Sequence, residues 1–182
     1  MIDGNNKILK KRGGDINFLI DTSAFQIFEE WHANFGINIL KKIINSKSVN
    51  FFIINDVWVE LCQKRDENYM NMFLQNTLNN EMCCSRDWKP NQFVVIQNGE
   101  PVVIKLNKIS STDYCQIILC QNHENLILVS NDKRQLKSAN TILKGRVKSP
   151  TMLIDYLVEK KFDKDIIEFK KITDKMKTKK II

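Results

Sequence analysis

Short apolar runs alternate with helical patterns along the chain. The runs INFLI (16–20), NFFIIN (50–55) and LILVS (126–130) are apolar on both faces, which is typical of strands buried in the middle of a parallel sheet. Helical periodicity follows the first two runs and precedes the third, in SAFQIFEEW, NILKKII, VWVELCQK, NYMNMFLQNTL and STDYCQIILCQNHE. Asn55 or Asp56 is expected to cap the helix after the second strand. The alternation predicts an α/β fold, a three-layer α/β/α sandwich with a mostly parallel central sheet.

Residues 92–106 depart from this alternation. Two runs of β-forming residues flank Asn98 and Gly99, a dipeptide suited to the left-handed φ angles of a type I′ hairpin turn. Pro101 restricts its strand to a sheet edge or a bulge, because proline has no N–H to donate. We therefore predict an inserted β-hairpin at about 88–107.

The chain of 182 residues has the length of one domain. Ordered structure is expected from about residue 15, after Gly13 and Gly14, and the core is expected to extend to about residue 158. Residues 160–182 contain nine lysines and four acidic residues, so they carry +5 of the net charge of +7. We predict that this basic C-terminal extension lies beyond the last core element. It suits phosphate backbones or acidic partners, and a role in solubility alone remains an alternative.

Composition narrows the class of protein. Apolar residues make up 43% of the chain and charged residues 27%, as in a globular protein. No run approaches the roughly 18 apolar residues that span a bilayer, so we expect a cytoplasmic protein without membrane contact. The five cysteines form no CxxC pair and are expected to be free thiols. With two histidines and no serine or cysteine motif beside a base, covalent catalysis by such a nucleophile is disfavoured.

Acidic residues recur where the predicted strands end or the helices begin. Asp21 directly follows the first strand, Asp132 lies just beyond the third, Glu60 lies in the helix after the second, and Asp113 opens the helix in SSTDY. Ligands of open α/β sheets bind at the carboxyl ends of the strands, so we expect the four acids at one edge. Four carboxylates there repel one another unless a divalent cation lies among them. The pattern predicts a Mg²⁺ or Mn²⁺ site suited to phosphoryl chemistry.

Each acid also has a simpler structural explanation. Asp21 can cap the helix that follows it, and Glu60 can pair with Lys64 one turn away. Asp113 can be a first-turn acid favoured by the helix dipole, and Asp132 can be a turn residue. These explanations treat the acids one at a time, whereas the metal site accounts for all four on one edge.

Taken together, these stretches resemble the PIN-domain ribonucleases. The resemblance rests on FLIDTSAF, VWVELC, STDYCQIILC and LILVSNDKR, in that order. It extends over about residues 15–158, including SPTMLIDYL as a closing strand-to-helix step. The ordered set of motifs, rather than any one of them, carries the resemblance.

The resemblance implies a PIN-like fold and an endoribonuclease that hydrolyses RNA phosphodiester bonds with one or two Mg²⁺ or Mn²⁺ ions. Many members of this family are toxins, so it also implies an antitoxin as a partner besides RNA, and we consider a homodimer as well. The chain differs from the compact toxins in its hairpin and its basic extension. The implied catalytic metal ligands are Asp21, Glu60, Asp113 and Asp132, the implied supporting residues are Thr22, Ser23 and Ser130, and the basic residues expected to bind RNA are Lys133, Arg134, Lys170 and Lys171.

Three alternatives stay open at this point. An RNA-binding module with the same fold but little turnover would keep the basic surface, and a chelator-sensitive cleavage assay distinguishes it from a nuclease. A dehalogenase-like phosphate-transfer enzyme would use Asp21 as its nucleophile, but such enzymes normally have a second aspartate two residues on, where this chain has Ser23. The third alternative is a structure-specific DNA nuclease.

Overall fold

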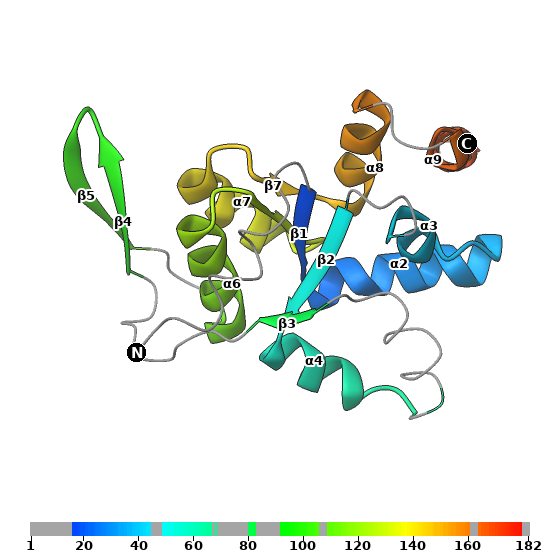
Figure 1. The fold of residues 1–182 in the computed structure, drawn as a ribbon, viewed down its shortest axis with the longest axis horizontal. Helices are drawn as coiled ribbons and strands as arrows, with labels where there is room; N and C mark the ends of the chain where they lie inside the picture. Colours follow the sequence, from blue (N-terminus) through cyan, green and yellow to red (C-terminus); the bar gives the residue numbers. More distant parts are fainter. Residues whose placement is uncertain are drawn as a thin grey trace.

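A five-stranded parallel sheet forms the centre of the molecule (Figure 1). The computed structural model describes residues 16–44, 49–66, 68, 80–82, 92–105, 109–160 and 164–179. In the sheet, β1 lies between β2 and β6 and is covered on both faces, so Phe18, Leu19 and Ile20 are fully buried. The strands, in the order β3-β2-β1-β6-β7, are β3 (Asn80–Met82), β2 (Val49–Ile54), β1 (Ile16–Ile20), β6 (Leu126–Val129) and β7 (Val147–Lys148).

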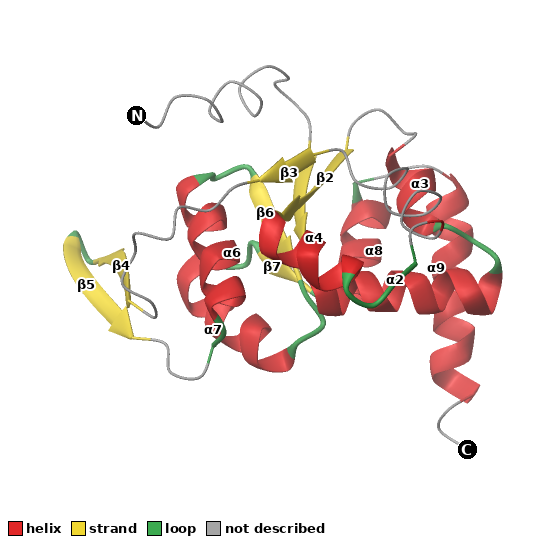
Figure 2. Cartoon of the chain, turned by 90° about the horizontal axis from the view of Figure 1, so that it is seen from below, coloured by secondary structure: helices red, strands yellow, loops and turns green. Residues whose placement is uncertain are grey.

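Helices cover both faces of this sheet (Figures 1 and 2). One face carries α2 (Thr22–Phe35), α3 (Ile39–Ile44), α4 (Asn55–Cys62) and α8 (Pro150–Glu159). The other face carries α6 (Ser111–Asn122) and α7 (Lys133–Leu143). The prediction of an α/β fold with a mostly parallel central sheet is confirmed.

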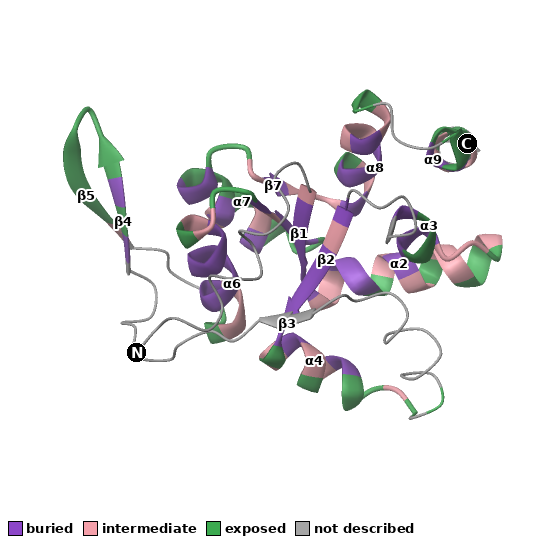
Figure 3. Cartoon of the chain, viewed as in Figure 1, coloured by how far each residue is buried: buried purple, intermediate pink, exposed green. Residues whose placement is uncertain are grey.

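The core is continuous through the sheet and the inner faces of the helices (Figure 3). Cys115 and Cys120 of α6 belong to it as free thiols, and burial raises the pKa of the Cys120 thiol well above its ordinary value. Cys62 is free and exposed, whereas Cys83 and Cys84 lie outside the described residues. Among the helices described, none has both the length and the apolar character that crossing a bilayer requires.

The predicted hairpin is present as a separate two-stranded antiparallel sheet. It consists of β4 (Gln92–Gln97) and β5 (Glu100–Lys105), and the turn between them has the positive φ angles of the predicted type, 54° at Asn98 and 86° at Gly99. Residues 88–91 and 106–107, at the predicted ends of the insertion, lie outside the described residues.

One face of the hairpin rests on α6. Phe93 is buried with its ring 4.9 Å from that of Tyr114, and the Gln121 side-chain amide donates to the Val94 carbonyl oxygen at 2.7 Å. The opposite face is exposed to solvent, as the green colour of β4 and β5 shows (Figure 3). That face includes Val94, Ile96 and Val103.

The prediction that Asn55 or Asp56 caps α4 is wrong. The N-cap is Ile54, whose backbone is still extended and whose side chain offers no hydrogen bond. Because β2 leads directly into the helix, Asn55 and Asp56 fall in its first turn instead. An acid there still interacts favourably with the positive end of the helix dipole.

The basic extension does not lie wholly beyond the core. Most of it forms α9 (Lys164–Lys179), which packs on α3 and α8. Ile166 and Phe169 are each 1% exposed, so they complete the core instead of following it. An ion pair of 2.8 Å joins Lys42 of α3 to Asp165 of α9. The prediction was based on the lysine content of this segment and overlooked these two apolar residues. They lie three residues apart, which is the spacing of residues on one face of a helix.

Two other predictions fall on residues that are not described. The helical pattern NYMNMFLQNTL covers residues 68–78, of which only residue 68 is described. The leader predicted for residues 1–14 also lies outside the described part of the chain.

Candidate active site

Asp21 lies at the point where β1 ends and α2 begins. Its backbone N–H donates to the Val129 carbonyl oxygen of β6 at 2.9 Å, which extends the sheet by one bond. Its carboxylate is 6% exposed and caps α2 by accepting from the Ser23 backbone N–H at 3.0 Å. It also accepts from the hydroxyls of Ser23 and Ser130. Asp21 therefore has a structural role at the start of α2, as its simpler explanation proposes.

The Ser23 hydroxyl connects Asp21 to the loop after β6. While it donates to Asp21, it accepts from the backbone N–H groups of Asn131 at 2.9 Å and Asp132 at 3.1 Å. The Asp132 N–H is also 3.0 Å from the Ser130 hydroxyl. Ser23 and Ser130 thus fix the backbone of Asp132 relative to the Asp21 carboxylate, which is the geometry that their predicted supporting role needs.

Glu60 is held on the same edge by two threonine hydroxyls. Thr22 donates to Oε2 at 2.6 Å, and Thr112 donates to Oε1 at 3.3 Å. Thr22 directly follows Asp21 and Thr112 directly precedes Asp113, so Glu60 lies between these two acids. It makes these bonds instead of pairing with Lys64.

Sequence reasoning missed Thr112. The one sequence signal for its role was its position next to Asp113, because Thr22 stands next to Asp21 in the same way. Nothing in that pattern indicates a partner 52 residues earlier in the chain.

Asp113 lies in the first turn of α6, as its simpler explanation proposes, whereas Asp132 is the N-cap of α7 and not the turn residue that its simpler explanation proposes. Asp113 forms a capping box with Ser110, in which each side chain accepts from the other's backbone N–H, at 3.1 and 3.0 Å. Asp132 is exposed and caps α7 by accepting from the Arg134 N–H at 2.6 Å. Because an ionised carboxylate has about four acceptor positions, a cap leaves capacity for a further interaction.

Burial raises the pKa of two of these acids, and repulsion by neighbouring carboxylates adds to the shift of one of them. Desolvation by burial raises the pKa of Asp113 above its ordinary value, the negative charges of Asp21 and Asp132 raise it further, and the bonds with Ser110 oppose the shift. Burial likewise raises the pKa of Asp21, against the hydrogen bonds from Ser23 and Ser130. Asp21 and Asp132 therefore lie close enough to Asp113 for their negative charges to act on it.

The donor set suits a hard divalent cation in its chemistry, because it consists of carboxylate and hydroxyl oxygens. In the described ranges, however, no three Asp, Glu, His or Cys side chains are arranged closely enough to hold one ion. Binding an ion would require the carboxylates to approach one another more closely than they do here. The structure thus brings the predicted acids to one edge without forming a coordination shell.

Two side-chain contacts between helices fix the relative positions of the helices that carry these acids. Arg65, just beyond α4, forms a half-buried bidentate ion pair with Glu29 of α2, and so fixes the helix that carries Glu60. The Gln135 side-chain amide of α7 donates to Gln116 of α6, and both side chains are fully buried. These glutamines lie three residues after Asp132 and Asp113, so their bond fixes the separation of the two helix starts.

We expect Asp113→Asn to stabilise the metal-free protein at neutral pH and not in acid. Because the folded-state pKa is raised above the ordinary 3.8, the folded protein binds this proton more tightly than the unfolded chain. The wild type therefore loses stability as pH rises through the interval between these two values, and keeps it below 3.8. Asparagine retains an oxygen for the Ser110 N–H and carries no charge.

Thermal unfolding in chelator measures this effect. The difference in Tm between variant and wild type should be positive near neutral pH and should shrink as pH falls below about 3.8. Glu124→Gln removes the same charge at an exposed position and serves as the control. A gain of equal size at both pH values would contradict the electrostatic explanation.

Comparisons with known proteins find a likeness among solved structures but none among family models or curated sequences. No protein-family model matches the chain, and neither does any curated protein sequence. Among solved structures, the chain is similar to the PIN domain endonuclease Utp24, with 14% sequence identity and a TM-score of 0.43. The match covers 70% of this chain and 78% of that one.

Proposed function

We propose that this chain is a metal-dependent endoribonuclease whose site comprises Asp21, Glu60, Asp113 and Asp132. The observation that carries the proposal is the convergence of these acids from four separate segments. Direct hydrogen bonds connect their neighbourhoods: Thr22 and Thr112 donate to Glu60, and the Ser23 hydroxyl donates to Asp21 while it accepts from the Asp132 backbone N–H.

The side chains at this edge of the sheet have different roles in metal-dependent hydrolysis of RNA. A bound Mg²⁺ or Mn²⁺ supplies polarisation of the phosphate and a water of lowered pKa. Asp21 and Asp113 offer carboxylates whose burial disfavours the unpaired charge, which favours binding a cation. Thr22 and Thr112 orient Glu60, and Ser23 fixes the approach of Asp132. The raised pKa values also mean that low pH protonates these ligands and weakens cation binding.

RNA as the substrate, and an antitoxin or a second copy as a partner, rest on the resemblance of the sequence motifs. A dehalogenase-like role fits the site less well than metal-assisted hydrolysis. Asp21 would have to be an accessible nucleophile, yet its carboxylate is 6% exposed and accepts several hydrogen bonds from Ser23 and Ser130.

A cleavage assay tests the proposal directly. We expect purified protein to cut labelled single-stranded RNA with Mn²⁺ or Mg²⁺ and to stop when a chelator is added. Thr112→Val should lower the rate by about 10- to 100-fold, as is usual when a residue that orients a metal ligand is removed. Because Thr112 acts through Glu60, raising the metal concentration should restore part of the rate.

Thr173→Val is the matched control, because in the described part of the chain its hydroxyl donates to the Lys170 carbonyl oxygen within α9, away from the four acids. It should leave the rate unchanged. Cleavage that persists in chelator, or an RNA complex that forms with metal and is never cut, would contradict the proposal. The second result would favour the RNA-binding module.

A further inference from the structure

Positive charge is concentrated in and just after α7, not only at the C-terminus. Residues 133–148 contain four lysines and two arginines and no acidic residue. Four of the six side chains are exposed, and we call them the basic face of α7. They are Lys133, Arg134, Lys137 and Lys144.

Three of these cations form a line along the helix axis. Lys133 and Lys137 are four residues apart, which places them on one face at 3.6 residues per turn, and Lys144 is the C-cap residue directly after the helix. The buried residues of α7, such as Gln135, Ala139 and Ile142, lie on the opposite face. From Lys133 to Lys144 the line extends for about 16 Å at 1.5 Å per residue. It begins at the residue after Asp132.

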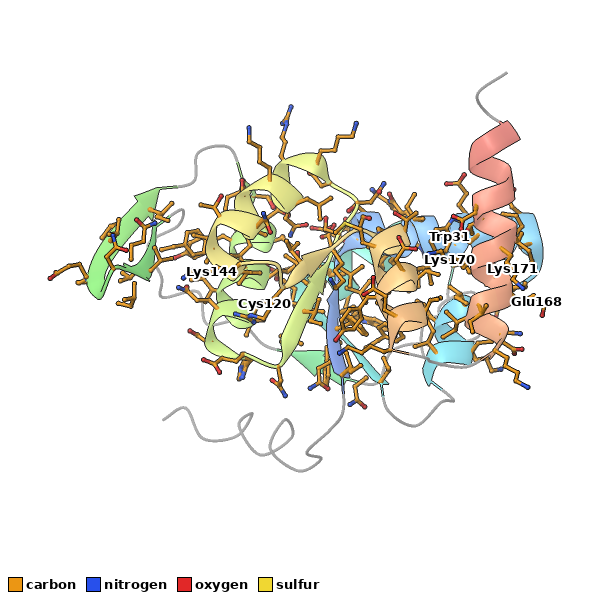
Figure 4. The ribbon with its side chains drawn as sticks, turned by 90° about the horizontal axis from the view of Figure 1, so that it is seen from above. Trp31, Cys120, Lys144, Glu168, Lys170 and Lys171 are labelled. Carbon is orange, nitrogen blue, oxygen red and sulfur yellow. The ribbon has the colours of Figure 1, made fainter. Side chains whose placement is uncertain are left out.

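The charge of α9 is arranged differently. Lys170 pairs with Asp155 at 2.5 Å, and α9 itself contains Asp165, Glu168 and Asp174 among its lysines. In the described part of the chain, none of the four cations of the basic face of α7 forms an ion pair with an acidic side chain. Figure 4 shows Lys144 on one side of the sheet and Lys170 and Lys171 on the far side, so the two groups form no continuous surface.

We propose that the basic face of α7 binds the phosphates of the nucleic-acid strand that the site cleaves, and leads that strand to Asp132. Several unpaired cations in a row suit the repeating charge of a phosphate backbone better than they suit a single acidic group. The row begins at the residue after Asp132 of the candidate active site, whereas α9 packs on α3 and α8, on the other side of the sheet from α7. The identity of the ligand as substrate rests on the proposed function.

Binding in chelator tests this proposal without requiring cleavage. The affinity of the full chain for a labelled single-stranded RNA of about 20 nucleotides is measured by fluorescence anisotropy at several salt concentrations. For the double variant Lys137→Gln/Lys144→Gln we expect the salt slope to fall by about 1.4, or 0.7 for each phosphate that no longer has a lysine beside it. Affinity near 0.1 M salt should fall by roughly tenfold or more.

The matched control is Lys41→Gln/Lys164→Gln, which removes the same charge from exposed positions on α3 and α9. Its slope should equal that of the wild type. Single-stranded DNA of the same sequence should show the same decrease in slope in the α7 variant, because the phosphates are common to both nucleic acids.

Three outcomes would overturn the proposal: a wild type that does not bind, an α7 variant with an unchanged slope, or a control whose slope falls as much as that of the α7 variant. Displacement of the RNA by polyglutamate at equal charge concentration would also overturn it, in favour of an acidic protein partner. Binding with the expected slopes in a protein that never cuts RNA would contradict only the proposed nuclease activity.

Discussion

Replacing Asp21 by asparagine should abolish RNA cleavage and leave the fold intact. Asp21 is the most central of the four acids, since it follows the middle strand of the sheet and bonds to both Ser23 and Ser130. The substitution removes a charged ligand from the proposed ion. We expect the rate to fall by more than the roughly 100-fold that is the upper end for residues that only support a metal ligand.

Stability should move in the other direction. Asparagine is as good an N-cap as aspartate, and its oxygen can still accept from the Ser23 N–H. Because burial raises the pKa of Asp21, the ionised wild type carries a penalty above the ordinary pKa of 3.8 that the variant lacks. In chelator at neutral pH, the Tm of the variant should therefore equal or exceed that of the wild type.

Glu30→Gln provides the control, because Glu30 is an exposed acid of the same helix. It should change neither the rate nor the Tm. A fully active Asp21→Asn protein would contradict the metal site, and an unfolded one would mean that the carboxylate is needed for the fold itself. Circular dichroism of the same preparation distinguishes these two results.

Phe169→Ala should destabilise the protein by about 3–5 kcal/mol, the usual cost of emptying a buried phenylalanine site. Phe169 is 1% exposed, and its ring lies 5.2 Å from that of Trp31 and 6.0 Å from that of Phe35. Since domains are stable by about 5–15 kcal/mol in total, this single change should remove a large part of the free energy of unfolding. Urea unfolding measures it as a lower midpoint with an unchanged slope.

Lys171→Ala is the matched control on the same helix, because Lys171 is exposed. Its effect should stay within about 0.5 kcal/mol. Equal stabilities for the wild type and the Phe169 variant would show that α9 is not part of the cooperative core. If the expected destabilisation is found, a truncation after about residue 165 would also destabilise the fold, because it removes Phe169. A loss of RNA binding by the truncated protein would then reflect unfolding before it reflects lost contacts with RNA.

The sequence predicts the three longest strands of the central sheet well because their pattern is distinctive, whereas the short strand β3 was not predicted. β1, β2 and β6 are continuous apolar runs of strand length, and only a sheet covered on both faces buries such runs. The turn at Asn98 and Gly99 was equally predictable, since few dipeptides accept two positive φ angles.

Contacts that depend on tertiary placement were not predictable in the same way. Ile54 precedes α4 without a side-chain cap because the strand leads straight into the helix, so the local capping preference of Asn55 had no effect. The position of Asp113 follows from its helix start, whereas the bond from Thr112 to Glu60 exists only once the two helices are packed. In α9, a high lysine content concealed the apolar positions of Ile166 and Phe169 that bury the helix.

The placement of β1 between β2 and β6 also determines when the site can form. Val49 pairs with Ile16 early in the chain, but Val129 pairs with Ile20 only after most of the chain exists. Asp21 and Ser130 are 109 residues apart, so their contact has a high sequence separation and requires the closure of a long loop. A ribosome would therefore have to release the chain through Asp132 before the four acids could meet, and a nascent chain interrupted earlier would carry Asp21 with Ser23 but without Ser130.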